Sequence, residues 1–478
     1  MSENSDEEKE IKPFAAIAGE EEIEFETETS KKNVFLWAMY DLANTIYSMI
    51  IVTLIISRYV LVIGQLEVGL DYDIALLIFG IVSGIMQVGV AICVPLIGAL
   101  SDTAGKRKPY VISLTGIILL FASLLGFFQN LAVVLLFYVI ANVAYQFSLT
   151  FYDAMLPFIA KREDIPKVSG FGVAWGYLGT LISLIIFIPL MFMWGDMVTD
   201  PDEGTISYGF AGHWETFVLA MFLFFIFALP FFFVREKQKK GKTPPFGKLL
   251  SGAYNQVKGT FKDIRKHRPM FIFIIGYFLV ADIANVLVGF MTILVRDALR
   301  VGFGTGIADI FATIFILIST VSAVIFTYFV GKFGEKLGGK NTFYLVGGLW
   351  TISLVIGVVL IFSLDSIVIG FNLPFIFSIM MGLVAGPALG GTWTAQRIMV
   401  AELAPKEKFG EYFGFSKLSG KLSSALGPIV FTSIYSAFSV FLGSDAYGIS
   451  LIAVGIIMAI GIYLISSVEV RDTLKKKA

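Results

Sequence analysis

The sequence is poor in the residues that build most metal and haem sites. Among 478 residues it has one cysteine, Cys93, and two histidines, His213 and His267. A single cysteine forms no intrachain disulfide and no cysteine-ligated metal site. Both histidines fall in polar connections, which excludes histidine-ligated haem and most zinc chemistry. We therefore predict no metal site and no cofactor.

The motifs of several enzyme classes are also missing. The sequence contains no His-Glu-x-x-His, no Gly-x-Ser-x-Gly and no phosphate-binding Gly-x4-Gly-Lys-Ser/Thr motif. The last absence excludes an ATP-driven pump within this chain. We predict that the protein is not an enzyme.

Charged residues are scarce, whereas apolar residues form long runs. Only 15% of the residues are charged and 56% are hydrophobic, with a mean hydropathy of +0.81. Soluble domains average about 25% charged residues and lack apolar runs of about 20 residues. Here such runs recur along the chain, and each suffices for a helix to cross about 30 Å of hydrocarbon. Strands would alternate in polarity, so we predict an all-α protein integral to a lipid bilayer.

The runs and the charges between them predict the topology. Twelve spans are expected near residues 34–62, 74–100, 109–128, 131–158, 168–194, 214–234, 270–295, 307–330, 342–363, 369–402, 411–436 and 446–468. Lys and Arg gather in alternate connections, and such connections face the cytoplasm. Both termini are therefore predicted to be cytoplasmic. The cell membrane is the expected location, with a vacuolar or lysosomal membrane as the alternative.

The longest basic connection divides the chain into two six-helix bundles. We predict an acidic disordered tail at 1–32, a bundle at 33–234, a basic cytoplasmic linker at 235–269, a second bundle at 270–468 and a basic tail at 469–478. The amphipathic stretch 246–261 of the linker has two interpretations, a solvated connection or a helix along the membrane surface.

Two motifs recur at corresponding places in the halves. Asp41–Asn44 in the first span has the same pattern as Asp282–Asn285 in the seventh. The loop Gly98–Lys108 shares its Gly–acid–Gly spacing with Gly331–Lys340. Two matches of different kinds indicate a duplicated six-helix unit. Paired halves of this kind place a substrate site near the midplane between them.

Several segments resemble the major facilitator superfamily. Gly98–Lys108 is similar to its signature loop, Gly-x-x-x-Asp-x-x-Gly-Arg/Lys-Arg/Lys. Four further segments resemble the vacuole-effluxer branch of that superfamily, at 37–44, 152–157, 172–179 and 413–428. The branch is related to autophagy proteins that export amino acids from the vacuole. The resemblance implies the major facilitator fold and an amino-acid cargo.

The chain departs from that branch at two positions. Members often have Trp after the first-helix aspartate, where this chain has Leu42. They often have Gln in the tenth helix, where this chain has Trp393. A bulky indole in place of an amide reshapes any pocket there, so the resemblance alone does not fix the substrate.

Ionisable groups within spans mark candidate functional residues, because they are costly unless they face a cavity or a partner. Each aspartate of the repeated motif shares a helix face with the asparagine three residues on. Such a pair can accept from a substrate amine or hold a proton; a structural bridge between helices is the alternative. The predicted substrate or proton site comprises Asp41, Asn44, Asp282, Asn285, Tyr40 and Trp393.

A second set of polar residues lies toward the predicted cytoplasmic side. The basic end of the signature loop can bridge to a neighbouring carboxylate and act as a latch that breaks in another conformation. Asp153 is expected to be either a gate residue or a partner of Lys106 and Arg107. Acidic and basic residues late in the tenth span and early in the eleventh form either a gate of ion pairs or snorkelling side chains. The predicted latch and gate residues are Gly98, Asp102, Gly105, Lys106, Arg107, Asp153, Glu335, Arg397, Glu402, Lys417 and Lys421.

These predictions converge on a secondary transporter that moves a small molecule by alternating access. We predict a monomeric amino-acid exporter or exchanger, with a co-transported proton as an option and no nucleic-acid partner. A cation-coupled sugar transporter is one alternative. A lipid-handling or solute-sensing protein on the same fold is the other.

Overall fold

The computed structural model describes residues 28–193, 214–237, 245–262, 267–303, 305–362, 367–368, 371–442 and 446–470. The tails predicted at 1–32 and 469–478 lie outside the described residues, apart from residues 28–32 and 469–470.

The described chain is helical almost throughout. The first half contains α1 (Lys31–Tyr47), η2 (Ser48–Ile55), α2 (Ile56–Val68), α3 (Tyr72–Ala104), α4 (Lys108–Leu124), η3 (Leu125–Phe127), α5 (Leu131–Ala154), η4 (Leu156–Phe158), η5 (Arg162–Asp164), α6 (Ile165–Met193), α7 (Trp214–Ala228) and η7 (Leu229–Phe233). After α8 (Phe246–Lys262), the second half contains α9 (Arg268–Phe303), α10 (Thr305–Phe362), β1 (Ile367–Val368), β2 (Phe371–Asn372), α11 (Leu373–Leu403), η8 (Lys406–Lys408), α12 (Phe409–Leu442) and α13 (Ala446–Ser466). The two short strands pair antiparallel.

Twelve spans follow from these helices. Eleven helical stretches of the described residues are long and apolar enough to cross a membrane. One of them, Ile314–Ile361, has 48 residues, about twice the length that the hydrocarbon core requires. It is interrupted at Gly338, where the backbone leaves the helical conformation. This stretch is therefore two spans, and the prediction of an all-α membrane fold with twelve helices is confirmed.

The repeated loop motif has a backbone reason. Gly105 ends α3 with a φ of 64°, and Gly338 turns the chain within α10 with a φ of 81°. Side chains other than glycine rarely adopt such a φ. Each half therefore reverses direction through a left-handed glycine three residues after the acidic residue of its loop.

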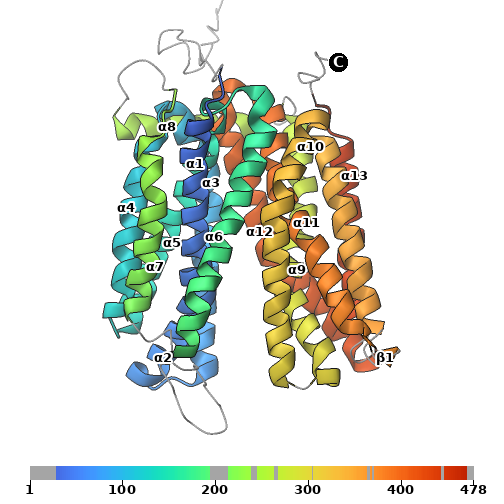
Figure 1. Ribbon diagram of the computed structural model, residues 1–478. Coiled ribbons are helices and arrows are strands. Elements are labelled where there is room, and N and C mark those ends of the chain that lie inside the picture. The colour runs from blue at the N-terminus through green and yellow to red at the C-terminus, as the bar shows by residue number, and fades with distance from the viewer. Residues whose placement is uncertain are drawn as a thin grey trace, which may run out of the picture.

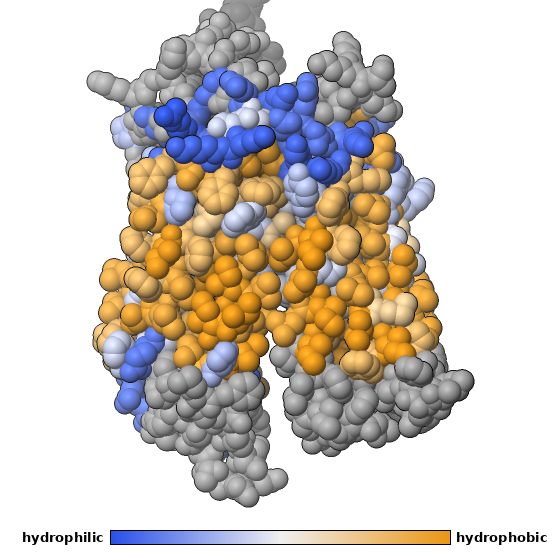
Figure 2. Space-filling model, in the orientation of Figure 1, coloured by the Kyte–Doolittle hydropathy of each residue, from blue (hydrophilic) through white to orange (hydrophobic). Residues whose placement is uncertain are grey.

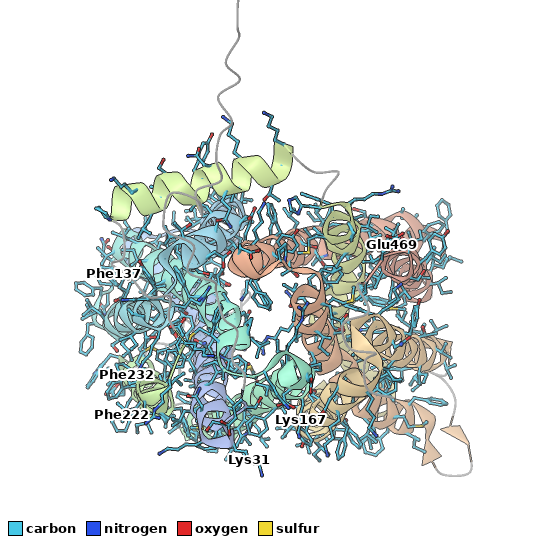
Figure 3. The ribbon with its side chains drawn as sticks, turned by 90° about the horizontal axis from the view of Figure 1, so that it is seen from above. Lys31, Phe137, Lys167, Phe222, Phe232 and Glu469 are labelled. Atoms are coloured by element: carbon cyan, nitrogen blue, oxygen red, sulfur yellow. The ribbon has the colours of Figure 1, made fainter. Side chains whose placement is uncertain are left out.

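The helices stand side by side in two halves (Figure 1), with an apolar belt around them (Figure 2). Ile85 and Ile92 of α3 are each 70% exposed, as expected for side chains that face lipid. A hydrophilic band covers one end of the belt (Figure 2). This end, called the basic face below, holds the connections after α3, α5, α7 and α11 and the turn at Gly338. Helix α8 lies crosswise there (Figure 3).

The first span is not a uniform α-helix. Residues Ser48–Ile55 form the π-helix η2. It begins directly after Tyr47, one helical turn beyond the predicted site residue Asn44. A π segment disturbs the regular hydrogen-bond ladder and frequently occurs at functional sites. The irregularity thus coincides with the level of the span at which a substrate site is predicted.

The two halves meet where α3 packs on α12 and α6 packs on α10. Glycines let the backbones approach closely near the basic face. A Cβ atom on Gly98 would lie 2.7 Å from the carbonyl carbon of Gly410, and one on Gly170 would lie 2.8 Å from the Cα of Gly331. Both contacts therefore require residues without side chains.

Gly98→Ala should loosen the contact between α3 and α12, because the added methyl group meets backbone atoms that cannot rotate away. Overpacking of this kind costs about 1–3 kcal/mol, which corresponds to a population shift of roughly 5- to 150-fold. Ser101 is buried at this contact. The alkylation rate of Ser101→Cys, in a Cys93→Ser background, therefore measures how often α3 and α12 separate. Gly89→Ala in the same helix is the control, because its Cβ would have no neighbour within 4 Å. Equal rates in the two variants would contradict the prediction.

Candidate functional site

The signature loop of the first half binds the start of α12 in the second half. The Asp102 carboxylate accepts from the backbone N–H groups of Gly410 at 2.8 Å and Glu411 at 2.9 Å. These N–H groups belong to the first turn of α12, where helices leave donors unpaired and attract negative charge. Arg107 donates to Asp102 at 3.4 Å. This loop-to-helix contact, called the latch below, fastens the halves together at the basic face.

Glu236 supports the latch, although it belongs to none of the sequence motifs. Its carboxylate accepts from the backbone N–H groups of Arg107 at 3.0 Å and Lys108 at 2.9 Å. It also pairs with the Arg107 side chain at 3.5 Å. The partners are about 130 positions apart in the sequence, and no local pattern marks such a contact. Lys106 has no side-chain partner among the described residues.

Four charged residues, three of them buried and Lys417 half-buried, join the halves deeper in the bundle. Arg397 of α11 pairs with Asp41 of α1 at 3.1 Å and with Asp153 of α5 at 3.0 Å. Lys417 of α12 pairs with Asp153 at 2.7 Å. These residues are called the central cluster below. Both carboxylates belong to the first half and both cations to the second, so the cluster attracts the halves to each other.

The central cluster lies between the basic face and the middle of the membrane. At about 1.5 Å per residue, Asp41 is about 15 Å along α1. Arg397 is about 9 Å from the end of α11 by the same rise. Charges at this depth are stable only when they are paired, because neither lipid nor protein solvates them as water does.

Aromatic rings enclose the cluster. Trp37 and Tyr152 stack with their centroids 4.5 Å apart, and the Arg397 guanidinium lies 5.9 Å from each ring centroid. Tyr177 of α6 and Tyr277 of α9 lie close enough to interact electrostatically with the cluster's charges. The rings exclude water and offer π-faces to the cation.

The other predicted gate residues contact different partners. Glu402 accepts from the backbone N–H of Gly339 at 2.9 Å. Arg162 of η5 approaches the carbonyl of Glu402 at 3.4 Å. Lys421 donates to Gln87 of α3 at 3.2 Å. The arginine and the lysine thereby add two contacts between the halves.

The structure gives two of the predicted residues ion-pair partners in the other half. Asp153, expected as a gate residue or as a partner of the basic end of the signature loop, binds Arg397 and Lys417. Asp41, expected as a substrate or proton ligand with a structural bridge as the alternative, has a carboxylate that pairs with Arg397. Glu335, which occupies the place of Asp102 in the second half, has no side-chain partner among the described residues.

Two predicted site residues lie deeper and are incompletely paired. Asn44 and Asp282 lie about 20 Å from the starts of α1 and α9. They are only 2% and 4% exposed. Neither amide atom of Asn44, nor Oδ1 of Asp282, has a hydrogen-bond partner among the described residues. An unpaired buried polar group costs about 1–3 kcal/mol, so these atoms are suited to bind a ligand.

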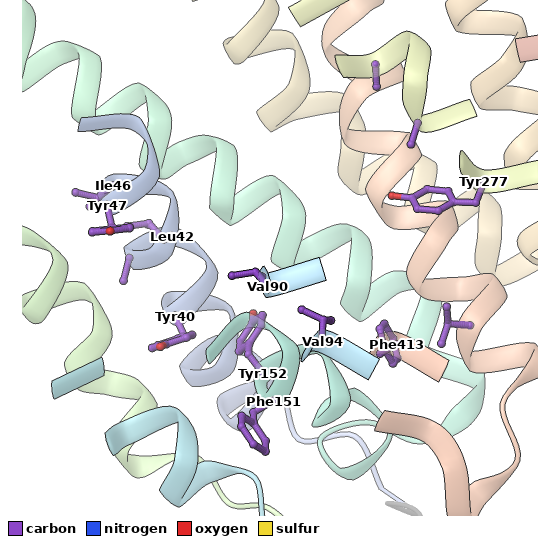
Figure 4. Close-up of a cluster of buried hydrophobic side chains, with 14 of the residues drawn as sticks. Tyr40, Leu42, Ile46, Tyr47, Val90, Val94, Phe151, Tyr152, Tyr277 and Phe413 are labelled. Carbon is purple, nitrogen blue, oxygen red and sulfur yellow. The ribbon is translucent and has the colours of Figure 1, made fainter. Parts of the chain in front are cut away.

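Three tyrosine hydroxyls share this property. The hydroxyls of Tyr47, Tyr152 and Tyr277 are buried and lack hydrogen-bond partners among the described residues. In Figure 4 the Tyr277 hydroxyl points from the second half toward the first, where the other two tyrosines lie. Both halves therefore carry buried hydroxyls without a hydrogen-bond partner among the described residues.

The polar pair of α9 faces α12. A Cβ atom on Gly427 would lie 2.9 Å from the carboxylate carbon of Asp282. The Asn285 side chain donates to the Ser423 hydroxyl at 3.2 Å. A glycine therefore leaves the space that Asp282 occupies, while the asparagine ties the two helices together.

The remaining predicted site residues have structural contacts. The Tyr40 hydroxyl lies 2.7 Å from the Thr115 hydroxyl in the interior of the first half. Trp393 of α11 lies near Tyr177 of α6, where these helices of the two halves pack together. Among the described residues, no group of three or more His, Cys, Asp and Glu could hold a metal ion.

Known proteins share this architecture. The chain is 10% identical to the major facilitator transporter FucP in its outward conformation, over 90% of this chain and 97% of that one, with a TM-score of 0.63. It is 12% identical to the proton:xylose symporter XylE, over 92% and 96% of the two chains, with a TM-score of 0.59. These similarities show the major facilitator fold.

Similarity in sequence identifies the family. The chain is 25% identical to the uncharacterized MFS-type transporter YxiO of Bacillus subtilis (strain 168), over 82% of this chain and 86% of the relative. The model of the family described as vacuole effluxer Atg22 like matches residues 73–476. The chain therefore belongs to the vacuole effluxer Atg22-like family and is a membrane transporter of the major facilitator type.

Proposed function

We propose that this transporter exports or exchanges amino acids by alternating access, and that the structure corresponds to its outward-facing state. The contacts between the halves described above all lie between the basic face and the middle of the spans. Below the middle of the apolar belt the halves part in Figure 2. The positive-inside rule assigns the basic face to the cytoplasm, so the open end faces outward.

The charges of the central cluster favour a zwitterionic cargo. Opening the basic face separates the carboxylates of Asp41 and Asp153 from the cations of Arg397 and Lys417. Unpairing a buried ion pair costs about 3–5 kcal/mol when nothing replaces the lost partner. An amino acid carries one group of each sign, so its carboxylate and ammonium can replace these partners during opening.

The deeper polar groups are suited to hold the same cargo before that step. The Asp282 carboxylate can accept from an ammonium group, while the Asn44 amide can donate to a carboxylate. The Tyr277 hydroxyl can bind either group. A proton carried by Asp282 is the alternative occupant, and it would couple transport to the proton gradient.

A sugar is the second candidate cargo. The chain resembles a proton:xylose symporter in fold, and it has an aspartate and an asparagine in its first span. A sugar is uncharged, however, and cannot replace the ionic partners that the central cluster loses. The charge of the cluster therefore supports the amino acid over the sugar.

Proteoliposomes preloaded with neutral amino acids should take up the same labelled amino acids by exchange. Asp282→Asn should lower the exchange rate about tenfold or more, because losing a charge-assisted hydrogen bond costs about 1.5–3 kcal/mol. Glu335→Gln should retain the wild-type rate, since this acid has no side-chain partner among the described residues. If folded wild-type protein shows no exchange above empty liposomes, the amino-acid cargo is rejected, and sugars and lipids are tested next.

Asn44→Leu should separate ligand binding from stability. The leucine removes a buried amide that has no protein partner among the described residues, so the free energy of unfolding should stay constant or rise by about 1–3 kcal/mol. Exchange should nevertheless fall, because the ligand loses its donor. Thermal unfolding and proteoliposome exchange measure the two effects. A large loss of stability would instead assign Asn44 a structural role.

The central cluster should behave as one coupled unit. Asp153→Asn and Lys417→Met should each lower the melting temperature, and the double variant should lose less than the sum, with a coupling of about 0.5–3 kcal/mol. The exposed pair Lys161–Glu163, at 3.7 Å with side chains 42% and 67% exposed, is the control. Its coupling should stay below about 1 kcal/mol. Additive losses in the cluster would contradict its role as a gate.

A further inference from the structure

Helix α8 is an element that the transport mechanism above does not use. It connects the halves and lies crosswise at the basic face (Figures 1 and 3). The sequence leaves two interpretations open for residues 246–261, and the structure forms a helix over Phe246–Lys262. Its residues divide into three stripes, each of which meets a different environment.

The first stripe faces the protein. Leu249, Ala253 and Thr260 are buried, with exposures of 2%, 0% and 1%, and Gln256 lies between them at helical spacing. Residues spaced by three and four positions share one side of a helix. This side packs against α3.

The protein-facing stripe binds the latch. The Gln256 amide donates to the Glu411 carboxylate at 2.9 Å and reaches the Asp102 carboxylate at 3.5 Å. Lys408, just before α12, donates to the Thr260 hydroxyl at 2.7 Å. Helix α8 therefore contacts both halves at the place where they are fastened together.

The second stripe is apolar and exposed. Leu250, Tyr254 and Phe261 are 40%, 58% and 51% exposed. Each follows a residue of the protein-facing stripe by one position, so the two stripes lie side by side around the helix. Large apolar side chains on a crosswise helix at the edge of an apolar belt are typical of interfacial helices.

The third stripe is basic. Lys248, Lys258 and Lys262 are exposed, with polar Ser251 and Asn255 between them. Residues 235–268 contain eleven Lys and Arg against two acidic residues. Each lysine near a membrane surface adds about fivefold to the affinity for an anionic leaflet. The charge complements phosphate headgroups, and the adjacent apolar stripe reaches the acyl chains beside them.

We propose that α8 binds the headgroups of anionic phospholipids at the basic face, and that this binding holds the latch closed. Because α8 contacts Asp102 of the first half and Glu411 of the second only while these meet, a lipid that holds α8 in this position favours the closed state. The lipid site is independent of the proposed function, whereas the effect on the latch rests on alternating access.

Site-specific quenching tests the lipid site. Cys93 is the chain's one cysteine, so Cys93→Ser gives a cysteine-free background for a fluorophore at Tyr254→Cys or at the neighbouring control, Asn255→Cys. In nanodiscs, brominated phosphatidylglycerol should quench position 254 about threefold more than position 255, because only the former faces acyl chains. Equal quenching at the two positions would overturn the insertion of the apolar stripe.

The lysine stripe is tested in the same assay. The triple variant Lys248→Gln, Lys258→Gln and Lys262→Gln should lose the preference for brominated phosphatidylglycerol over brominated phosphatidylcholine. The ratio of quenching by the two lipids should fall by at most about fivefold for each lysine removed. A second triple variant, Lys161→Gln, Lys332→Gln and Lys336→Gln, removes the same charge from the basic face away from α8 and should keep the preference. If both triple variants respond alike, α8 is not the lipid site.

Spin labels at Lys106→Cys and Glu407→Cys test the effect on the latch. The closed, short-distance population should be about twofold or more larger in phosphatidylglycerol than in phosphatidylcholine nanodiscs. Gln256→Ala should still bind the lipid but lose this response. Lipid binding without any change in distance would overturn the coupling and leave the lipid site standing. Amino-acid exchange is measured separately, so its absence would reject the proposed cargo without affecting either lipid result.

Discussion

Arg397 is the residue on which the arrangement of the two halves depends. Its guanidinium belongs to the second half, and both of its carboxylate partners, Asp41 and Asp153, belong to the first. Because each half alone would bury charges of one sign, each would bear a desolvation penalty that only the other half offsets. The cluster is thus stable while the halves are together and costly once they part, as a gate between two conformations requires.

The ion pairs also require that the backbones of the two halves lie close together. Gly98 and Gly410 let α3 touch α12, and this contact places the Asp102 carboxylate at the first turn of that helix. The carboxylate then satisfies N–H groups that the helix cannot satisfy itself. The latch and the central cluster therefore reinforce each other, since glycine contacts at the basic face align α12, which carries Lys417.

The parts that the sequence predicts are those encoded by local patterns. Runs of apolar residues define the spans, and a repeated acid-to-glycine spacing indicates the duplicated unit, whose two loops the structure turns at Gly105 and Gly338. Ionisable residues within spans are recognisable because lipid makes them costly. The partners of these residues cannot be recognised from the sequence, since Asp41 and Arg397 are 356 positions apart. Gln256 gives no signal at all, because a glutamine in a polar linker is unremarkable until the fold places it against the latch.

Duplication predicts equal roles for Asp41 and Asp282, yet their surroundings differ. The first faces the cation of Arg397, whereas the second packs beside Gly427 with one oxygen unpaired among the described residues. Because the repeat fixes position along the span but not the residue opposite, one aspartate can serve the gate while its counterpart stays available to a ligand. In the proposed transport cycle, the deeper carboxylate meets the cargo first, and the charges of the cargo reach the cluster only as the basic face opens. Under that proposal, the broken symmetry orders binding before opening.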